Sequence, residues 1–126
     1  MPTPRTKLGV WGEELAVRFL GENGYKIIAT NYRCAYGEVD IVAMDGEELV
    51  FVEVRTRRPG NFGTPEESVS THKLRRLLAT CQDYLRNSGQ ENIQWRVDLI
   101  SVRLEKGLSK NPKVERIDHL SHVLQQ

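Results

Sequence analysis

Two acidic residues and one basic residue stand in neighbouring strand-like segments at spacings that could bind a metal ion. Asp40 lies in a segment rich in valine and isoleucine, and Glu53 and Arg55 lie in the next such segment. The dipeptide Asp45-Gly46 separates the two segments, and it is typical of hairpin turns. The sequence therefore predicts a hairpin that carries a carboxylate on each strand.

The pleat and the turn of this hairpin decide how close the carboxylates come. Residues two apart on a strand share a face, so we expect Glu38 and Asp40 on one face and Val39 and Ile41 on the other. A turn made of Asp45 and Gly46 alone would place Asp40 diagonal to Glu53, and a turn of four residues would place the two directly opposite. Both registers bring the carboxylates to one face.

Carboxylates on adjacent strands lie about 5–7 Å apart and repel each other unless a positive charge intervenes. A divalent cation bound through oxygen, Mg²⁺ or Mn²⁺, supplies that charge and can polarise a phosphodiester, which Arg55 would also contact. The alternative is a solvated hairpin whose charged side chains only pair across the strands. Glu53, however, interrupts the apolar run 50–54, which is typical of a central strand, where an unpaired carboxylate is costly.

The elements that would position these residues follow from periodicity and turn signals. The order of helix, three strands, helix and strand indicates an α/β domain with a mixed sheet flanked by helices. The second helix is expected to be capped by Thr71 and to end before Gly89. The expected elements are a helix at 8–20, strands at 25–29, 38–44, 49–56 and 95–102, a helix after residue 71, an edge strand at 114–117 and a short helix in the tail.

Composition limits the class of protein. The chain has 126 residues, of which 39% are hydrophobic, which suits one globular domain spanning 1–126. No apolar run approaches the roughly 18 residues of a membrane span, and no secretion signal is recognisable at the N-terminus, so we expect a cytoplasmic protein. The net charge of +1 argues against binding nucleic acid through bulk charge alone. Cys34 and Cys81 lie far apart and indicate neither a zinc site nor a disulfide framework.

A set of short motifs spread over most of the chain resembles the YraN-like bacterial proteins. That family is similar to the PD-(D/E)XK nuclease superfamily and, in layout, to the archaeal Holliday-junction resolvases. The motifs are Gly9 with Gly12-Glu13 and Ala16, Asn31 with Arg33, residues 37–42 and 51–57, Phe62-Gly63, Lys73, and Arg96-Val97-Asp98.

The resemblance implies a restriction-endonuclease-like, three-layer α/β core and a role for each matching residue. Asp40 and Glu53 become the ligands of Mg²⁺ or Mn²⁺, and Glu13 becomes the carboxylate of the first helix. Glu14 flanks the same apolar stripe and is the alternative to Glu13. Arg55 occupies the position of the motif lysine, and arginine can hold a phosphate but cannot act as a general base.

The implied activity is metal-dependent hydrolysis of phosphodiester bonds, with DNA expected in preference to RNA. The alternative is a catalytically inert module of the same fold that binds nucleic acid and serves a recombination or DNA-uptake partner. Arg57, Arg58 and Lys73 are the expected nucleic-acid contacts, with Phe62 as a residue that could stack on a base. A homodimer is also compatible with the resemblance, because junction-cutting relatives work as symmetric pairs. The three histidines, residues 72, 119 and 122, lack partners at ligand spacing and are interpreted as structural.

Overall fold

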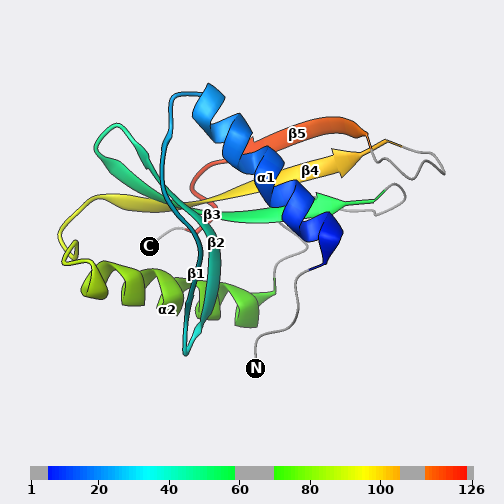
Figure 1. Ribbon diagram of the computed structural model, residues 1–126. Coiled ribbons are helices and arrows are strands. Elements are labelled where there is room, and N and C mark those ends of the chain that lie inside the picture. Colours follow the sequence, from blue (N-terminus) through cyan, green and yellow to red (C-terminus); the bar gives the residue numbers. More distant parts are fainter. Residues whose placement is uncertain (1–5, 59–69, 106–112, 125–126) are drawn as a thin grey trace.

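The computed structural model describes residues 6–58, 70–105 and 113–124. Two helices and five strands make up the described chain (Figure 1). Their bounds, in chain order, are α1 Lys7–Glu22, β1 Lys26–Cys34, β2 Gly37–Asp45, β3 Glu48–Arg57, α2 Thr71–Asn87, β4 Trp95–Leu104 and β5 Val114–Leu120.

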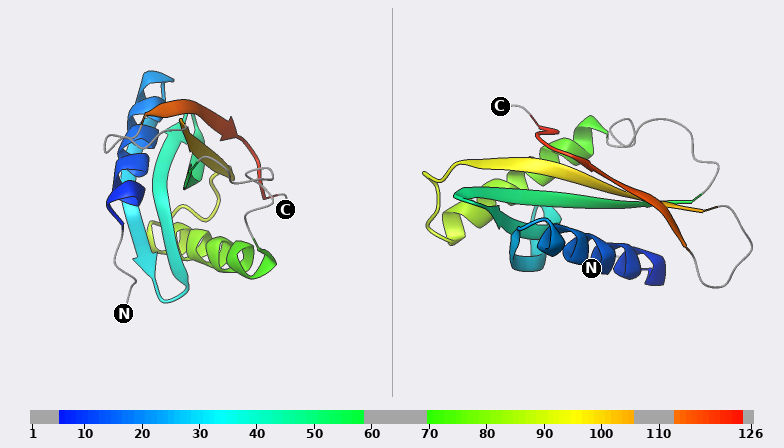
Figure 2. Two further views of the ribbon diagram at one scale, coloured as in Figure 1. Left: turned by 90° about the vertical axis from the view of Figure 1, so that its right-hand side faces the viewer. Right: turned by 90° about the horizontal axis from the view of Figure 1, so that it is seen from above.

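The five strands form one sheet in the order β1-β2-β3-β4-β5. The pairs β1–β2, β2–β3 and β4–β5 are antiparallel, whereas β3 and β4, which α2 connects, run parallel. Helices α1 and α2 lie on opposite faces of this sheet, as the two turned views show (Figure 2). The expected three-layer α/β architecture with a mixed sheet is confirmed.

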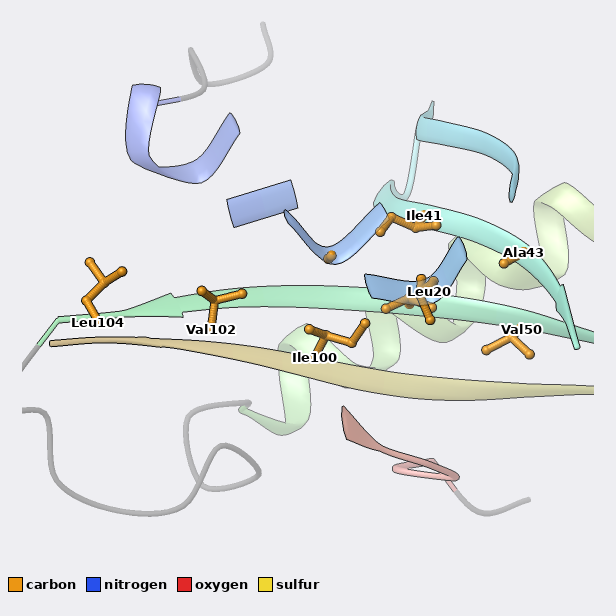
Figure 3. Close-up of a cluster of buried hydrophobic side chains, with 9 residues drawn as sticks. Leu20, Ile41, Ala43, Val50, Ile100, Val102 and Leu104 are labelled. Atoms are coloured by element: carbon orange, nitrogen blue, oxygen red, sulfur yellow. The ribbon is translucent and has the colours of Figure 1, made fainter. Parts of the chain in front are cut away.

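Each helix closes its own hydrophobic core. Under α1, Ala16 and Leu20 pack against inward-facing residues of β2, β3 and β4, among them Ile41, Val50 and Ile100 (Figure 3). On the other face, α2 packs against a second cluster of the same strands. Because β3 is covered on both sides, residues 49–53 are all buried, which explains the nearly continuous apolar run in its sequence.

Helix α1 approaches the sheet unusually closely at Gly12. A Cβ atom at this position would overlap the Oγ1 of Thr56 on β3 and would lie 3.3 Å from the Thr56 Cβ. Only glycine permits this approach without displacing the helix. The next residue on α1 is Glu13, so the contact fixes the distance of that carboxylate from the sheet.

Three local predictions need correction. The N-cap of α2 is Ser70, whose side chain accepts a hydrogen bond from the Lys73 N–H, and Thr71 is the first helical residue. Strand β1 extends to Cys34, beyond the predicted end at residue 29. The tail helix is wrong: β5 continues to Leu120, and residues 121–124 are not helical, because His119 and the His122 N–H are held by Asp98 of the neighbouring β4.

In the described part of the chain, no helix is long and apolar enough to cross a membrane.

A candidate metal centre between the two helices

The register of the β2–β3 hairpin brings Asp40 and Glu53 together. Asp45 pairs with Glu48 across a loop of two residues, Gly46 and Glu47. This is the register that places Asp40 opposite Glu53, and the negative charge of Glu53 acts directly on Asp40. The predicted convergence of the two carboxylates is confirmed.

The regular alternation predicted for β2 breaks at Asp40. Val39 packs in the cluster beneath α2, whereas Ile41 packs in the cluster beneath α1, so the two residues do not share a face as expected. The Oδ2 of Asp40 accepts a hydrogen bond of 2.7 Å from the Val54 N–H. A carboxylate thus takes a backbone donor of β3 at the point where the described β2–β3 pairing ends.

Three carboxylates from two elements converge on one point. Glu13 of α1 and Glu38 and Asp40 of β2 each offer an oxygen, and these oxygens lie within 4.8 Å of one another. This grouping supports the choice of Glu13 over Glu14, which is exposed and does not belong to the group. Glu38 had no role assigned from the sequence, although its position two residues before Asp40 was the signal.

The pKa of Asp40 is strongly shifted by its surroundings. The residue is 6% exposed, and burial, followed by the negative charge of Glu53, raises its pKa from 3.8 to about 7. Within residues 6–58, 70–105 and 113–124, no basic side chain forms an ion pair with Asp40. At neutral pH the carboxyl group therefore holds a proton part of the time, or it requires a cation.

Glu53, in contrast, is neutralised by two basic residues. The Lys73 Nζ lies 3.0 Å from the Glu53 Oε1, and the Arg55 Nη2 lies 3.5 Å from the same oxygen. Lys73 reaches the site from the first turn of α2. The Arg55 Nε is buried and has no hydrogen-bond partner among the described residues.

Two cavities meet at Asp40. A cavity of about 340 Å³ lies between the hairpin and α2. Its wall includes Glu38, Asp40 and Glu53 of the hairpin and His72, Lys73, Arg76 and Leu77 of α2. A cavity of about 310 Å³ lies between α1 and the strands β1 and β2, with Glu13, Glu14, Asn31 and Asp40 in its wall. A ligand could therefore reach the Asp40 carboxylate from either face of the sheet.

Comparison with known proteins identifies the family of the chain. A family model described as "Uncharacterised protein family UPF0102" matches residues 12–102. The chain belongs to this family. The matched region contains all the site carboxylates and, apart from Val10, the residues that line the two cavities. The resemblance to the YraN-like proteins is confirmed at the level of the family.

Similar members come from diverse bacteria. The UPF0102 protein of Roseiflexus castenholzii is 40% identical over 97% of this chain and 96% of its own length. The UPF0102 protein of Caldanaerobacter subterraneus is 37% identical over 93% and 91%, and that of Moorella thermoacetica is 44% identical over 84% and 88%. The alignment of nearly the full length of each chain indicates a shared fold, and the printed names assign no activity.

The basic residues expected to bind nucleic acid differ in their surroundings. Arg57 is 7% exposed at the end of β3, whereas Arg58 is exposed. Lys73 points at Glu53 across the larger cavity. Phe62 lies outside the described residues.

Arg76 is a basic residue at the site to which the sequence assigned no specific role. Its Nε donates a hydrogen bond of 3.1 Å to the carbonyl oxygen of Tyr36 in the β1–β2 turn. Its guanidinium forms no ion pair with any carboxylate of the described chain. His72, interpreted as structural from the sequence, lines the same cavity.

A second polar cluster lies away from the site and was also missed. Asp98 is fully buried on β4, where it accepts hydrogen bonds from Arg96 and from the His122 N–H. The His119 Nε2 lies 2.8 Å from its Oδ2. Burial alone would raise the pKa of Asp98, but these bonds outweigh it and lower the pKa. Arg96 also contacts Glu48 at 2.5 Å. This cluster ties the C-terminal segment to the sheet, which gives the Arg96-Val97-Asp98 motif a structural explanation.

Proposed function

We propose that this protein is a metal-dependent nuclease that hydrolyses phosphodiester bonds in nucleic acid. One observation carries the proposal: the buried Asp40 carboxyl lies among Glu13, Glu38 and Glu53 and has no basic ion-pair partner among the described residues. Lys73 and Arg55 pair with Glu53, and Arg33 pairs with Glu38, whereas the buried Asp40 carboxylate would need a proton or a cation to offset its charge. A structural ion-pair network would have placed a lysine or arginine against Asp40.

The donor set fits a hard divalent cation. All candidate ligands are carboxylate oxygens, which suits Mg²⁺ or Mn²⁺ better than the softer metals that prefer sulfur or imidazole. Glu13, Glu38 and Asp40 would hold the ion, and Glu53, expected from the sequence to be a ligand as well, lies beside Asp40. When bound, the ion would polarise a phosphodiester and lower the pKa of an attacking water.

Basic residues in and beside the larger cavity would bind the substrate phosphate: Lys73 and Arg76 line it, and Arg55 pairs with Glu53 of its wall. Arg55 stays protonated at any working pH, so it can stabilise negative charge on the phosphate but cannot remove a proton. Lys73 supplies an amine 3.0 Å from the Glu53 Oε1, next to the arginine that occupies the position of the motif lysine. Arg76 and the exposed Arg58 would bind neighbouring phosphates and so position the nucleic-acid strand along the site.

The similarity to PD-(D/E)XK enzymes and Holliday-junction resolvases, inferred from the sequence motifs, supports a restriction-endonuclease-like interpretation of the three-layer fold. The same similarity favours DNA over RNA and is compatible with a homodimer that acts on a symmetric substrate. In this proposal the protein works in the cytoplasm, where its substrate would be located.

The test is cleavage of labelled linear, branched and single-stranded DNA, with matched RNA, in Mg²⁺ and in Mn²⁺. Wild type is compared with Glu53→Gln, Arg55→Ala and Arg55→Lys. We expect Arg55→Ala to lower the rate on the order of 100-fold, the cost of removing one charge-stabilising donor. Arg55→Lys should keep most of the rate, because lysine also stabilises the phosphate.

The outcomes separate the two functional classes. Binding of DNA by wild type without cleavage, together with Mn²⁺-dependent nicking by Arg55→Lys, would indicate the inert binding module instead of the enzyme. Arg75→Gln serves as a control, because this exposed residue of α2 does not line the cavity. If neither wild type nor any variant cleaved or bound nucleic acid, a nucleic-acid function would be refuted.

A further inference from the structure

Asn31 has an unusual backbone conformation in the interior of a strand. Its φ is 55°, and among the described non-glycine residues only His122, which follows the last strand, also has a positive φ. The left-handed region is unfavourable for side chains with a Cβ, and asparagine tolerates it better than most. A residue held this way inside a strand marks a constraint imposed by its surroundings.

The position of Asn31 identifies that constraint. On β1 it lies between Thr30, which pairs with Ile41, and Tyr32, which pairs with Val39. The residue between those two partners on β2 is Asp40. The left-handed turn of Asn31 thus occurs beside the site carboxylate, where Val39 and Ile41 pack into opposite cores and the Asp40 carboxyl lines both cavities.

The surroundings of the Asn31 side chain also connect this residue with the candidate metal centre. Its Oδ1 is buried and accepts no hydrogen bond from any described residue. Asn31 lines the smaller cavity together with Glu13 and Asp40. A buried amide oxygen in a polar cavity ordinarily binds water or an ion, and asparagine oxygens are common members of divalent-cation sites.

We propose that Asn31 is a positioning residue of the metal centre. Its left-handed backbone bends β1 so that the Asp40 carboxylate borders the cavities on both faces of the sheet. Its amide oxygen orients a water held beside Glu13 and Asp40 on the α1 side. The inference rests on the proposed function, since it requires a divalent cation at these carboxylates.

Three substitutions separate the backbone contribution from that of the amide. Asn31→Gly keeps the left-handed conformation and removes the oxygen, Asn31→Asp keeps both, and Asn31→Val loses both. The measurement is the dissociation constant for Mn²⁺ by titration calorimetry on the full chain, with thermal melts of each variant in EDTA. Glu14→Gln is the matched control, because Glu14 lines the same cavity but does not belong to the carboxylate group.

We expect Asn31→Gly to bind Mn²⁺ about 10-fold more weakly than wild type, the lower end of the effect of removing an outer-shell partner. Asn31→Val should bind more weakly still and melt at a lower temperature, whereas Asn31→Asp and Glu14→Gln should bind within about 3-fold of wild type or more tightly.

Unchanged affinity in Asn31→Gly would overturn the role of the amide. Equal affinities in Asn31→Gly and Asn31→Val, with both proteins folded, would overturn the role of the backbone. If wild type itself failed to bind Mn²⁺, the proposed metal centre and this inference would fall together, and that outcome is distinct from a failure confined to the Asn31 variants.

Discussion

The substitution Asp40→Asn is expected to stabilise the protein when no metal is bound. The pKa of Asp40 rises from 3.8 to about 7, and each pKa unit corresponds to about 1.4 kcal/mol, so the ionised carboxylate destabilises the metal-free fold by at most about 4 kcal/mol. Asparagine removes the charge and keeps an oxygen that can accept the hydrogen bond from the Val54 N–H. Allowing for relaxation around the neighbouring Glu53, we expect a gain of about 2 kcal/mol in the free energy of unfolding at pH 8.

The pH dependence of this gain follows from the sign of the shift. A raised pKa means that wild type has its full stability below the unfolded value of 3.8 and loses stability as the pH rises through about 7. The advantage of Asp40→Asn should therefore be large at pH 8 and small at pH 5. Urea denaturation in EDTA, followed by circular dichroism at both pH values, measures it.

Metal should reverse the order of the two proteins. A ligand that binds only the native state adds about 2.7 kcal/mol at 100 times its dissociation constant, so Mn²⁺ should stabilise wild type and leave Asp40→Asn nearly unchanged. Asp118→Asn, an acid on β5 that pairs with Arg116, is the control and should shift stability by less than about 0.5 kcal/mol. An Asp40→Asn protein that is less stable than wild type at pH 8 in EDTA would refute the reasoning.

Three other substitutions probe the scaffold and the substrate side of the site. Gly12→Ala should destabilise the fold by about 1–3 kcal/mol because of its overlap with β3, measured by urea denaturation. Asp98→Asn should cost about 3 kcal/mol at pH 7, since it leaves Arg96 and His119 without their buried acid; because the pKa of Asp98 is lowered, the wild-type advantage should shrink as the pH falls below about 4. Arg76→Gln should lower the salt dependence of single-strand binding by a slope of about 0.7, the value for one lost phosphate contact, and an unchanged slope would remove Arg76 from the interface.

Most of the architecture could be predicted because it depends on local periodicity. The hydrophobic stripe of α1 and the apolar run of β3 each reflect the number of faces that the element buries. The Asp45-Gly46 dipeptide located the hairpin, although the loop itself consists of Gly46 and Glu47. The length of β5 could not be predicted, because it depends on a long-range contact of His119 with Asp98.

The site was predicted in part for the same reason. The convergence of Asp40 with Glu53 requires only a register, and two registers gave the same face. Val39 and Ile41 pack on opposite faces of the sheet, next to the hydrogen bond from the Val54 N–H to Asp40 and the left-handed backbone of Asn31. A pattern that alternates every two residues predicts none of these features. Lys73 could be connected to Glu53 only through the packing of α2, since 20 positions separate the two residues in the sequence.

The irregularity at Asp40 connects the fold with the chemistry proposed for it. A regular strand would direct Asp40 to the α2 face alone, with Glu53 and Lys73, and would leave Glu13 of α1 on the other side of the sheet. At the left-handed residue Asn31 and the close approach of α1 at Gly12, Asp40 instead lies near Glu13 of α1 as well as near Glu38 and Glu53 of the sheet. The cost is an acid whose pKa is raised to about 7, and a protein under selection for stability alone would replace it. If the proposed cation offsets this repulsion, the comparison of Asp40→Asn with wild type, in EDTA and in Mn²⁺, tests the fold and the function in one experiment.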